Sequence, residues 1–362
     1  MKINILLPYK EKFDMNETSS VSITVRNNMA HSIYLNQIKV FGQNVKTPLF
    51  KDNFVGLKYS ILSLKSKNIF LAKEMLKIIS KDTETRHLLE IHNRPYLVEE
   101  VTKGNKFPVS LFFHNDPLTM RGSKSIKERE KILRKCTAIF CVSEFIKKKF
   151  LEGIKIDKKK VHVLYNGVDT KLKKIPLKKN EILFVGRLVF EKGADLYVDV
   201  IKSIAQDNPT WSFGLLGSSN TKNKNTYASE VIRKLKSVGV QAKFYGFKNQ
   251  KFVKEKMKNA SIIVIPSLCE EAFGLVAAEA MSNGMAIIAS KVGGIPEIVK
   301  NNGILIEEID FIKLRNALLD LIHNRHKREM LQKNAWLNFV HSSKKSSKNL
   351  DNFRQIIFQN FY

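Results

Sequence analysis

Residues 261–290 read SIIVIPSLCEEAFGLVAAEAMSNGMAIIAS and contain the clearest structural signal in the chain. The apolar runs 262–266 and 286–290 are expected to be strands, and the segment between them has the pattern of a short helix. We expect that helix to begin near Phe273 and to end at Asn283 and Gly284, since glycine is a common C-terminal stop. A strand, a helix and a second strand form the repeating unit of a parallel sheet.

The same alternation of apolar runs and helical segments extends over the whole chain. Expected strands cover residues 3–7, 38–40, 88–91, 109–113, 138–142, 161–165, 182–185, 211–216, 241–244, 261–265, 286–290 and 304–306. The pattern restarts after a lysine-rich connector that contains Pro176, so we place a domain boundary near residue 175. The predicted fold class is α/β, with two doubly wound domains facing each other across a cleft.

The C-terminal part is expected to be helical. Residues 310–341 have a helical pattern, residues 342–347 form a polar hinge, and residues 349–362 are again apolar at helical spacing. These boundaries divide the chain into segments 1–175, 176–345 and 346–362.

Composition limits the classes of protein to be considered. The first apolar run is followed by Pro8 and by charged residues, and it is too short for a signal peptide or a membrane span. Cys136, Cys141 and Cys269 are an odd number without CxxC spacing, so neither a disulfide framework nor a zinc site is expected. A reduced, cytoplasmic location fits best.

The formal net charge of +28 suggests an anionic partner. Lysines gather in segments 147–149, 158–160, 171–179, 221–225 and 248–258. A membrane surface at the inner face is the favoured partner, because nothing resembling a nucleic-acid-binding motif accompanies the lysines. The alternative is a compositional bias toward lysine, with solvated faces and no function.

Glu271 and Glu279 lie eight positions apart around the start of the expected helix. The backbone N–H groups of Phe273, Gly274, Leu275 and Val276 would crowd its N-terminus, which attracts a diphosphate. Eight helical residues span roughly 12 Å, so one carboxylate can hold a sugar and the other a ribose. In the alternative reading, Glu271 is a helix cap and Glu279 a solvated helix residue.

A second candidate site follows the expected strand 182–185. Gly186 permits close backbone approach, Arg187 offers a planar fork for phosphate oxygens, and Lys192 adds another positive charge. By itself, this string is better explained as a strand-to-helix turn with surface charges. A third candidate is His114, followed by Asn115 and Asp116, at the end of the expected strand 109–113. A lone histidine is more often structural than catalytic.

These strings, together with Pro266-Ser267 and Val292-Gly293-Gly294-Ile295-Pro296-Glu297, resemble the retaining glycosyltransferases of family 4, which have the GT-B fold. The resemblance implies that Arg187 and Lys192 bind the donor diphosphate and that His114 contacts the donor sugar near the reacting carbon. It also implies an acceptor-side domain over 1–175, a donor-binding domain over 176–345, and a last helix that returns to the first domain.

The implied activity is transfer of a sugar from a nucleotide-diphosphate donor to a glycan or lipid-linked acceptor, with retention of configuration. Residues 91–95 and 114–117 most resemble members that build lipopolysaccharide or surface polysaccharide, although a strand and a turn before Pro95 explain the first string equally well. No cofactor beyond the co-substrate and no metal is expected, since the chain has no Asp-x-Asp. Two alternatives stay open: a nucleotide-sugar epimerase and a degenerate membrane scaffold. The glycine-free loop 17–22 departs from the family pattern.

Overall fold

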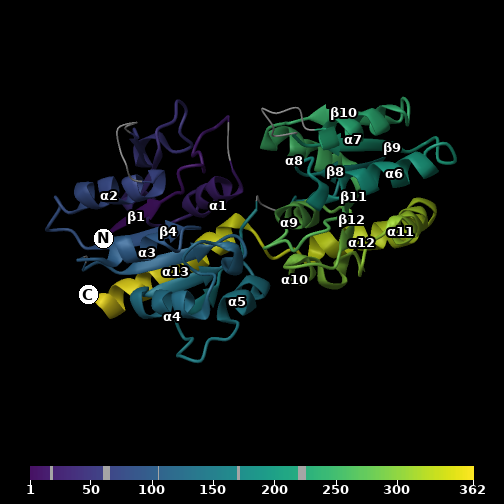
Figure 1. Ribbon diagram of the computed structural model, residues 1–362. Coiled ribbons are helices and arrows are strands. Elements are labelled where there is room, and N and C mark those ends of the chain that lie inside the picture. The colour runs from purple at the N-terminus through teal and green to yellow at the C-terminus, as the bar shows by residue number, and fades with distance from the viewer. Residues whose placement is uncertain (17–18, 60–65, 105, 169–171, 219–225) are drawn as a thin grey trace. The chain divides into compact units, whose positions relative to one another are not determined.

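The computed structural model (Figure 1) describes residues 1–16, 19–59, 66–104, 106–168, 172–218 and 226–362. They divide into two units, Met1–Gly167 with His341–Tyr362, and Val168–Val340. The division falls before the boundary expected near residue 175, because the connector is bonded to the second unit. The Leu172 N–H donates to the Ser282 carbonyl at 3.1 Å, and Trp336 Nε1 donates to the Leu172 carbonyl at 2.8 Å.

The first unit is built on a parallel sheet with the strand order β3-β2-β1-β4-β5-β6-β7 among the described residues. The strands are β1 (Lys2–Leu6), β2 (Ile38–Gln43), β3 (Phe54–Leu57), β4 (His87–His92), β5 (Val109–Phe113), β6 (Ala138–Cys141) and β7 (Val161–Val163). The helices are α1 (Ser20–Met29), α2 (Lys67–Ile79), α3 (Leu97–Thr102), α4 (Ile126–Lys135), α5 (Glu144–Leu151) and α13 (Ser343–Phe361), with short 3-10 turns at Leu35–Gln37, Lys51–Asn53 and Pro117–Thr119. Strands β4 and β5 are buried along their whole length, as expected for a parallel sheet covered on both faces.

The second unit repeats the plan with the strand order β10-β9-β8-β11-β12-β13. Its strands are β8 (Lys179–Val185), β9 (Ser212–Leu216), β10 (Ala242–Gly246), β11 (Ala260–Ile265), β12 (Ala286–Ser290) and β13 (Ile304–Ile306). Its helices are α6 (Ala194–Ile204), α7 (Thr226–Lys236), α8 (Gln250–Asn259), α9 (Leu275–Ser282), α10 (Ile295–Val299), α11 (Phe311–His323) and α12 (Arg325–Leu337), with 3-10 turns at Phe190–Lys192 and Lys300–Asn302. Each described strand pairs in parallel with its neighbours, so the loops after β8 and β11 leave the same edge of the sheet.

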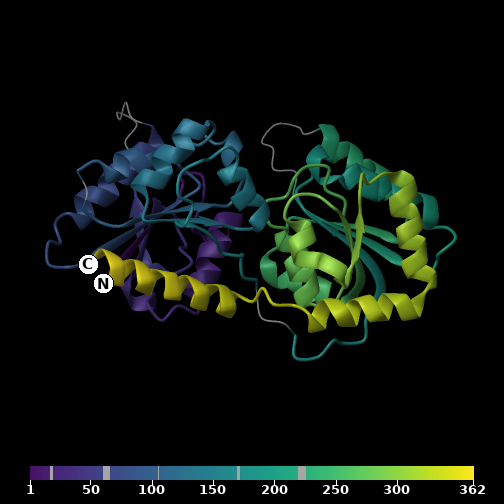
Figure 2. The same ribbon diagram turned by 90° about the horizontal axis from the view of Figure 1, so that it is seen from below.

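The C-terminal helix α13 belongs to the first unit, where it packs against α1 (Figure 2). The expected polar hinge over residues 342–347 is wrong, because the helix already begins at Ser343 with Ser342 as its cap. Ser346 Oγ donates to the Tyr165 carbonyl at 2.9 Å, and Ser347 Oγ donates to the Asn28 carbonyl at 2.7 Å. The polar character of this stretch therefore reflects serines that bond to backbone carbonyls of the first unit, and not a hinge.

The other differences from the expected elements are local. Strand β3 was not expected, since it is a four-residue edge strand interrupted by Gly56. The helical region 310–341 consists of two helices, separated where Asn324 ends α11 and accepts a hydrogen bond from the Lys327 N–H of α12. In the expected loop 17–22, residues 17–18 lie outside the described residues. Ser19 caps α1, which begins at Ser20, so the rest of that loop is the start of a helix.

Candidate functional site

Two neighbouring loops of the second unit bring together the pair Lys192 and Glu271. Strands β8 and β11 are adjacent and parallel, with Phe184 opposite Val264, so residues 186–193 and 266–274 emerge side by side. The Leu268 N–H donates to the Glu191 carbonyl at 2.9 Å and joins the two loops. The Lys192 ammonium forms an ion pair with the Glu271 carboxylate, which also accepts a hydrogen bond from Ser267 Oγ at 2.7 Å.

Gly193 and Gly293 are required for this close packing. A Cβ atom on Gly193 would lie 2.1 Å from the Pro266 carbonyl oxygen, and one on Gly293 would lie 2.2 Å from that of Glu271. Both glycines also have positive φ angles, of 65° and 58°, which other residues rarely adopt. The Gly294 N–H donates to the Glu271 carbonyl at 2.7 Å. The sequence indicated Gly293 and Gly294 only as part of a resemblance. The structure shows that these two glycines hold the Glu271 backbone in place.

Helix α9 begins at Leu275, two residues after the expected start at Phe273. Gly274 precedes it in a left-handed conformation and provides no side-chain cap, while Phe273 is buried. The first N–H groups of a helix have no intrahelical acceptors, so those of Leu275 and Val276 are available to an external anion. Helix α6 likewise begins after a glycine, Gly193, without a side-chain cap.

This later start changes the relation between the two carboxylates. Glu271 lies in the loop before α9, whereas Glu279 is a half-buried residue within the helix. The estimate of roughly 12 Å assumed that both belong to one helix, and it therefore does not apply. Glu271 is positioned by its loop contacts, and Glu279 by the helix.

Arg187 projects from the loop that follows β8. The neighbouring backbone is fixed, because the Gly186 N–H donates to the Leu216 carbonyl at 3.0 Å and the Leu188 N–H to the Ser218 carbonyl at 3.1 Å. The Arg187 side chain itself is exposed to solvent. A guanidinium on a rigid loop at this edge of the sheet is suited to bind phosphate oxygens in two-pronged fashion.

In the first unit, His114 follows β5 directly and contacts His92, the last residue of β4. His92 Nδ1 and His114 Nε2 are 2.8 Å apart, and the His114 N–H donates to Asn93 Oδ1 at 2.9 Å. Burial lowers the pKa of His114 to about 4. Burial and the charges of His114 and Arg354 lower the pKa of His92 well below its usual value. Both rings are therefore neutral at pH 7.

The sequence did not indicate His92 as a partner of His114. One signal was available, since both histidines stand at the carboxyl ends of strands that are neighbours in the sheet. Glu90, two residues before His92, forms a buried ion pair with Arg354 of α13 at 2.8 Å through both carboxylate oxygens. No local pattern reveals a partner 264 positions away.

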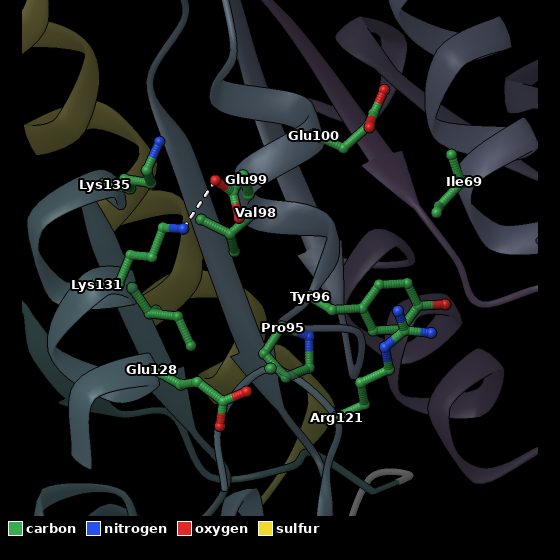
Figure 3. Close-up of a pocket in the computed structure, with 12 residues that line it drawn as sticks. Ile69, Pro95, Tyr96, Val98, Glu99, Glu100, Arg121, Glu128, Lys131 and Lys135 are labelled. Carbon is green, nitrogen blue, oxygen red and sulfur yellow. Dashed lines mark ion pairs between the residues drawn. The ribbon is translucent and has the colours of Figure 1, made fainter. Parts of the chain in front are cut away.

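A separate pocket of about 450 Å³ lies between α2, α3 and α4 of the first unit (Figure 3). Its acidic side chains are already engaged: Glu99 pairs with Lys131 at 2.7 Å and Glu100 with Lys73 at 2.9 Å, while Glu128 caps the start of α4. The Arg121 guanidinium lies over the Tyr96 ring. None of the candidate donor-binding residues lines this pocket, so we assign it no part in donor binding.

No group of three or more His, Cys, Asp or Glu side chains is arranged to hold a metal ion in the part of the chain that the structure describes. Within the same residues, none of the helices combines the length and apolar character needed to cross a membrane.

Comparisons with known proteins bear on the family and on the fold. Residues 168–336 match the family described as glycosyl transferases group 1, and residues 37–172 match glycosyltransferase family 4. An uncharacterised glycosyltransferase of Methanocaldococcus jannaschii is 34% identical over 199 residues, which cover 54% of this chain and 53% of that protein. The lipopolysaccharide 1,2-N-acetylglucosaminetransferase of Salmonella typhimurium is 31% identical over 121 residues, or 33% of this chain and 32% of that protein.

The chain spans about half the length of the curated relatives it matches. Its likeness to a solved structure extends much further. The crystal structure of Anabaena HepE in complex with UDP and glucose has a TM-score of 0.76 at 17% identity, covering 98% of this chain and 99% of that one. At this identity the likeness defines the fold alone, which is GT-B.

Proposed function

Since this chain belongs to the glycosyltransferases of the group 1 and family 4 type, we propose that it transfers a sugar from a nucleoside-diphosphate sugar to a glycan or lipid-linked acceptor. The observation that carries the proposal is the Lys192–Glu271 pair in the loops beside the uncapped N-terminus of α9. Opposite charges and helix N–H groups at one edge of the sheet are suited to bind a ligand that joins a diphosphate to a hydroxyl-rich sugar.

The ion pair suggests how a donor is received. A diphosphate carries more negative charge than one carboxylate, and it competes with Glu271 for the Lys192 ammonium. The N–H groups of Leu275 and Val276 and the Arg187 guanidinium add to the attraction. Glu271, once released from Lys192, accepts hydrogen bonds from sugar hydroxyls. Binding thus replaces one ion pair with a lysine–diphosphate contact and with hydrogen bonds between Glu271 and sugar hydroxyls.

The proposed roles follow from this exchange. Arg187, Lys192 and the α9 N-terminus stabilise the negative charge that develops on the leaving diphosphate, which is the main electrostatic contribution to rate. Gly186 permits close approach of the backbone, Glu279 holds the ribose, and Phe273 and Gly274 shape the turn before α9. His114 contacts the donor sugar. Transfer is proposed to retain the anomeric configuration, as the resemblance to family 4 implies.

We propose that no metal ion is needed, because two side-chain cations and a helix N-terminus already balance the diphosphate. EDTA should leave turnover intact. If EDTA abolishes transfer and magnesium restores it, this distribution of charge is wrong.

The acceptor is proposed to belong to lipopolysaccharide or surface polysaccharide synthesis, in line with the name of the Salmonella relative. A cytoplasmic enzyme that meets a lipid-linked acceptor would work at an anionic membrane surface. Lys148, Lys158, Lys159 and Lys160 are exposed, and Lys160 also donates to the Leu133 and Cys136 carbonyls, which stabilises the end of α4. Residues 169–171 and 221–225, which contain other lysines of the clusters, lie outside the described residues.

Cys269 offers a test of donor binding that needs no acceptor. Cys136 and Cys141 are buried, and burial raises the pKa of Cys136 to about 12, whereas Cys269 is half-buried. Burial raises the pKa of the Cys269 thiol, and the charges of Lys192 and Glu271 also act on it, so the thiol lies close to this pair. Alkylation followed by mass spectrometry should therefore modify Cys269 first, and a bound donor should slow that reaction.

The decisive experiment combines binding with turnover. A panel of nucleoside-diphosphate sugars is screened by thermal shift, because a ligand that binds the folded state raises apparent stability. Donors that bind are then tested for Cys269 protection and for release of the nucleoside diphosphate, with and without candidate acceptors. Acceptor-dependent release supports transfer. A changed sugar without release identifies an epimerase, and binding with neither reaction, or no binding at all, contradicts the proposal.

A further inference from the structure

The His92–His114 contact fixes how the two imidazole rings share their protons. Each ring is neutral at pH 7 and carries one N–H, and the 2.8 Å bond joins His92 Nδ1 to His114 Nε2. One of these two nitrogens donates and the other accepts. Two arrangements satisfy the bond, and they differ in the proton carried by the remaining nitrogen of each ring.

The enclosed nitrogen of His92 decides between these arrangements. His92 Nε2 is buried and has no hydrogen-bond partner among the described residues. If His114 donates, Nε2 carries a buried, unpaired N–H, whereas if His92 donates, it carries only a lone pair. Buried donors without partners are rarer than buried acceptors without partners, so donation by His92 is favoured.

The surroundings of His92 keep its ring neutral and hold it in place. Glu90 and His92 lie on the same face of β4, because side chains alternate along a strand, and Arg354 reaches Glu90 on that face. The positive charge of Arg354 acts on His92. The ring also stacks on Phe112, with centroids 4.4 Å apart, which restricts its rotation.

We propose that His92 is a positioning residue that donates from Nδ1 to His114 and holds His114 in the tautomer with a proton on Nδ1. His114 then presents an N–H donor at the carboxyl edge of the first sheet. A donor at this position is suited to an oxygen of a sugar or acceptor, and it cannot act as a base. The consequence for turnover rests on the proposed function, whereas the tautomer itself does not.

The tautomer can be measured without any substrate. In ¹⁵N-labelled protein, two-bond proton–nitrogen spectra distinguish a protonated from an unprotonated ring nitrogen. We expect His114 Nδ1 to be protonated and Nε2 to be unprotonated at pH 7. The reverse assignment for His114 would overturn the proposal, whether or not the protein proves to be a transferase.

Two substitutions separate positioning from simple packing. His92→Asn keeps an N–H close to the place of Nδ1, so His114 should keep its tautomer and its activity. His92→Leu removes the donor, so the tautomer should no longer be fixed. Loss of one such hydrogen bond should lower kcat about 2- to 10-fold, with little change in donor KM. Thermal melts establish that both variants are folded.

His87→Leu is a matched control on the same strand. His87 is also buried, and its Nδ1 bonds to the Asn4 side chain at 3.0 Å, at the opposite end of β4. The His87→Leu variant should be less stable than the wild type, but its His114 spectrum and its kcat should be unchanged. If His92→Leu also leaves the His114 spectrum unchanged, or if His87→Leu alters it equally, His92 has no specific positioning role.

Discussion

Replacing Glu271 by glutamine tests the assignment of this carboxylate to the sugar. The change removes one negative charge while nearly preserving the shape of the side chain. In the structure this carboxylate contacts the Lys192 ammonium and Ser267 Oγ. Its backbone is held separately by Gly293 and Gly294, so the loop should keep its course in the variant.

The expected magnitude follows from the charged hydrogen bonds that Glu271 can form. Both side chains of the Lys192–Glu271 pair are 20% exposed, so the site is shielded but still reached by water. Hydrogen bonds to a charged partner contribute roughly 1.5–3 kcal/mol, or about ten- to more than a hundredfold in rate. If the contact strengthens as charge develops at the anomeric carbon, the loss appears in kcat more than in donor KM.

Glu279 provides the contrasting case. If it holds only the ribose, its contact is nearly equal in the ground and transition states. Glu279→Gln should then chiefly raise donor KM and leave kcat close to that of the wild type.

Steady-state kinetics against the donor, at a fixed acceptor concentration, measure both parameters for each variant. Glu270→Gln is the matched control, because it makes the same change in an exposed side chain one position away, and near-wild-type kinetics are expected. Thermal melts check the folding of all three variants. Loss of kcat in Glu279→Gln with little change in Glu271→Gln would refute the assignment, and unchanged kinetics in both would make the motif purely structural.

Three further predictions concern stability and association. Arg354→Met leaves Glu90 buried without its partner and should lower the free energy of unfolding by about 3–5 kcal/mol, whereas adding Glu90→Gln should restore part of it; urea unfolding measures both. Because burial lowers the pKa of His114 from 6.5 to about 4, the unfolded chain binds more protons between these values, so stability should fall as pH decreases from 6.5 to 4, by up to about 3 kcal/mol. That pH dependence of stability should be smaller in His114→Gln, and a dependence identical to that of the wild type would contradict the prediction. Binding to anionic vesicles should weaken steeply with salt, as charge screening requires; equal binding to neutral vesicles, or none to either, would exclude a role for the exposed lysines.

Local sequence patterns were sufficient to place most of the strands. Buried parallel strands are continuous apolar runs bounded by turn residues, so segments such as 109–113 and 286–290 coincide with β5 and β12. The same patterns placed Arg187, Lys192, Glu271 and His114 after the carboxyl ends of strands, where α/β proteins bind ligands. Strand β3 was not predicted, because four residues at a sheet edge, one of them glycine, give too weak a sequence pattern.

Pairings between distant residues depended on the tertiary structure. Lys192 and Glu271 are 79 positions apart, and Glu90 and Arg354 are 264 apart, and each pair meets only because of the strand order and the path of α13. The start of α9 depends on Gly274, whose left-handed backbone ends the preceding loop. The spacing of apolar residues along the sequence does not predict that conformation. Periodicity reflects which face of an element is buried. The identity of a side chain's partner is set by how the sheet and its crossovers bring separate segments together.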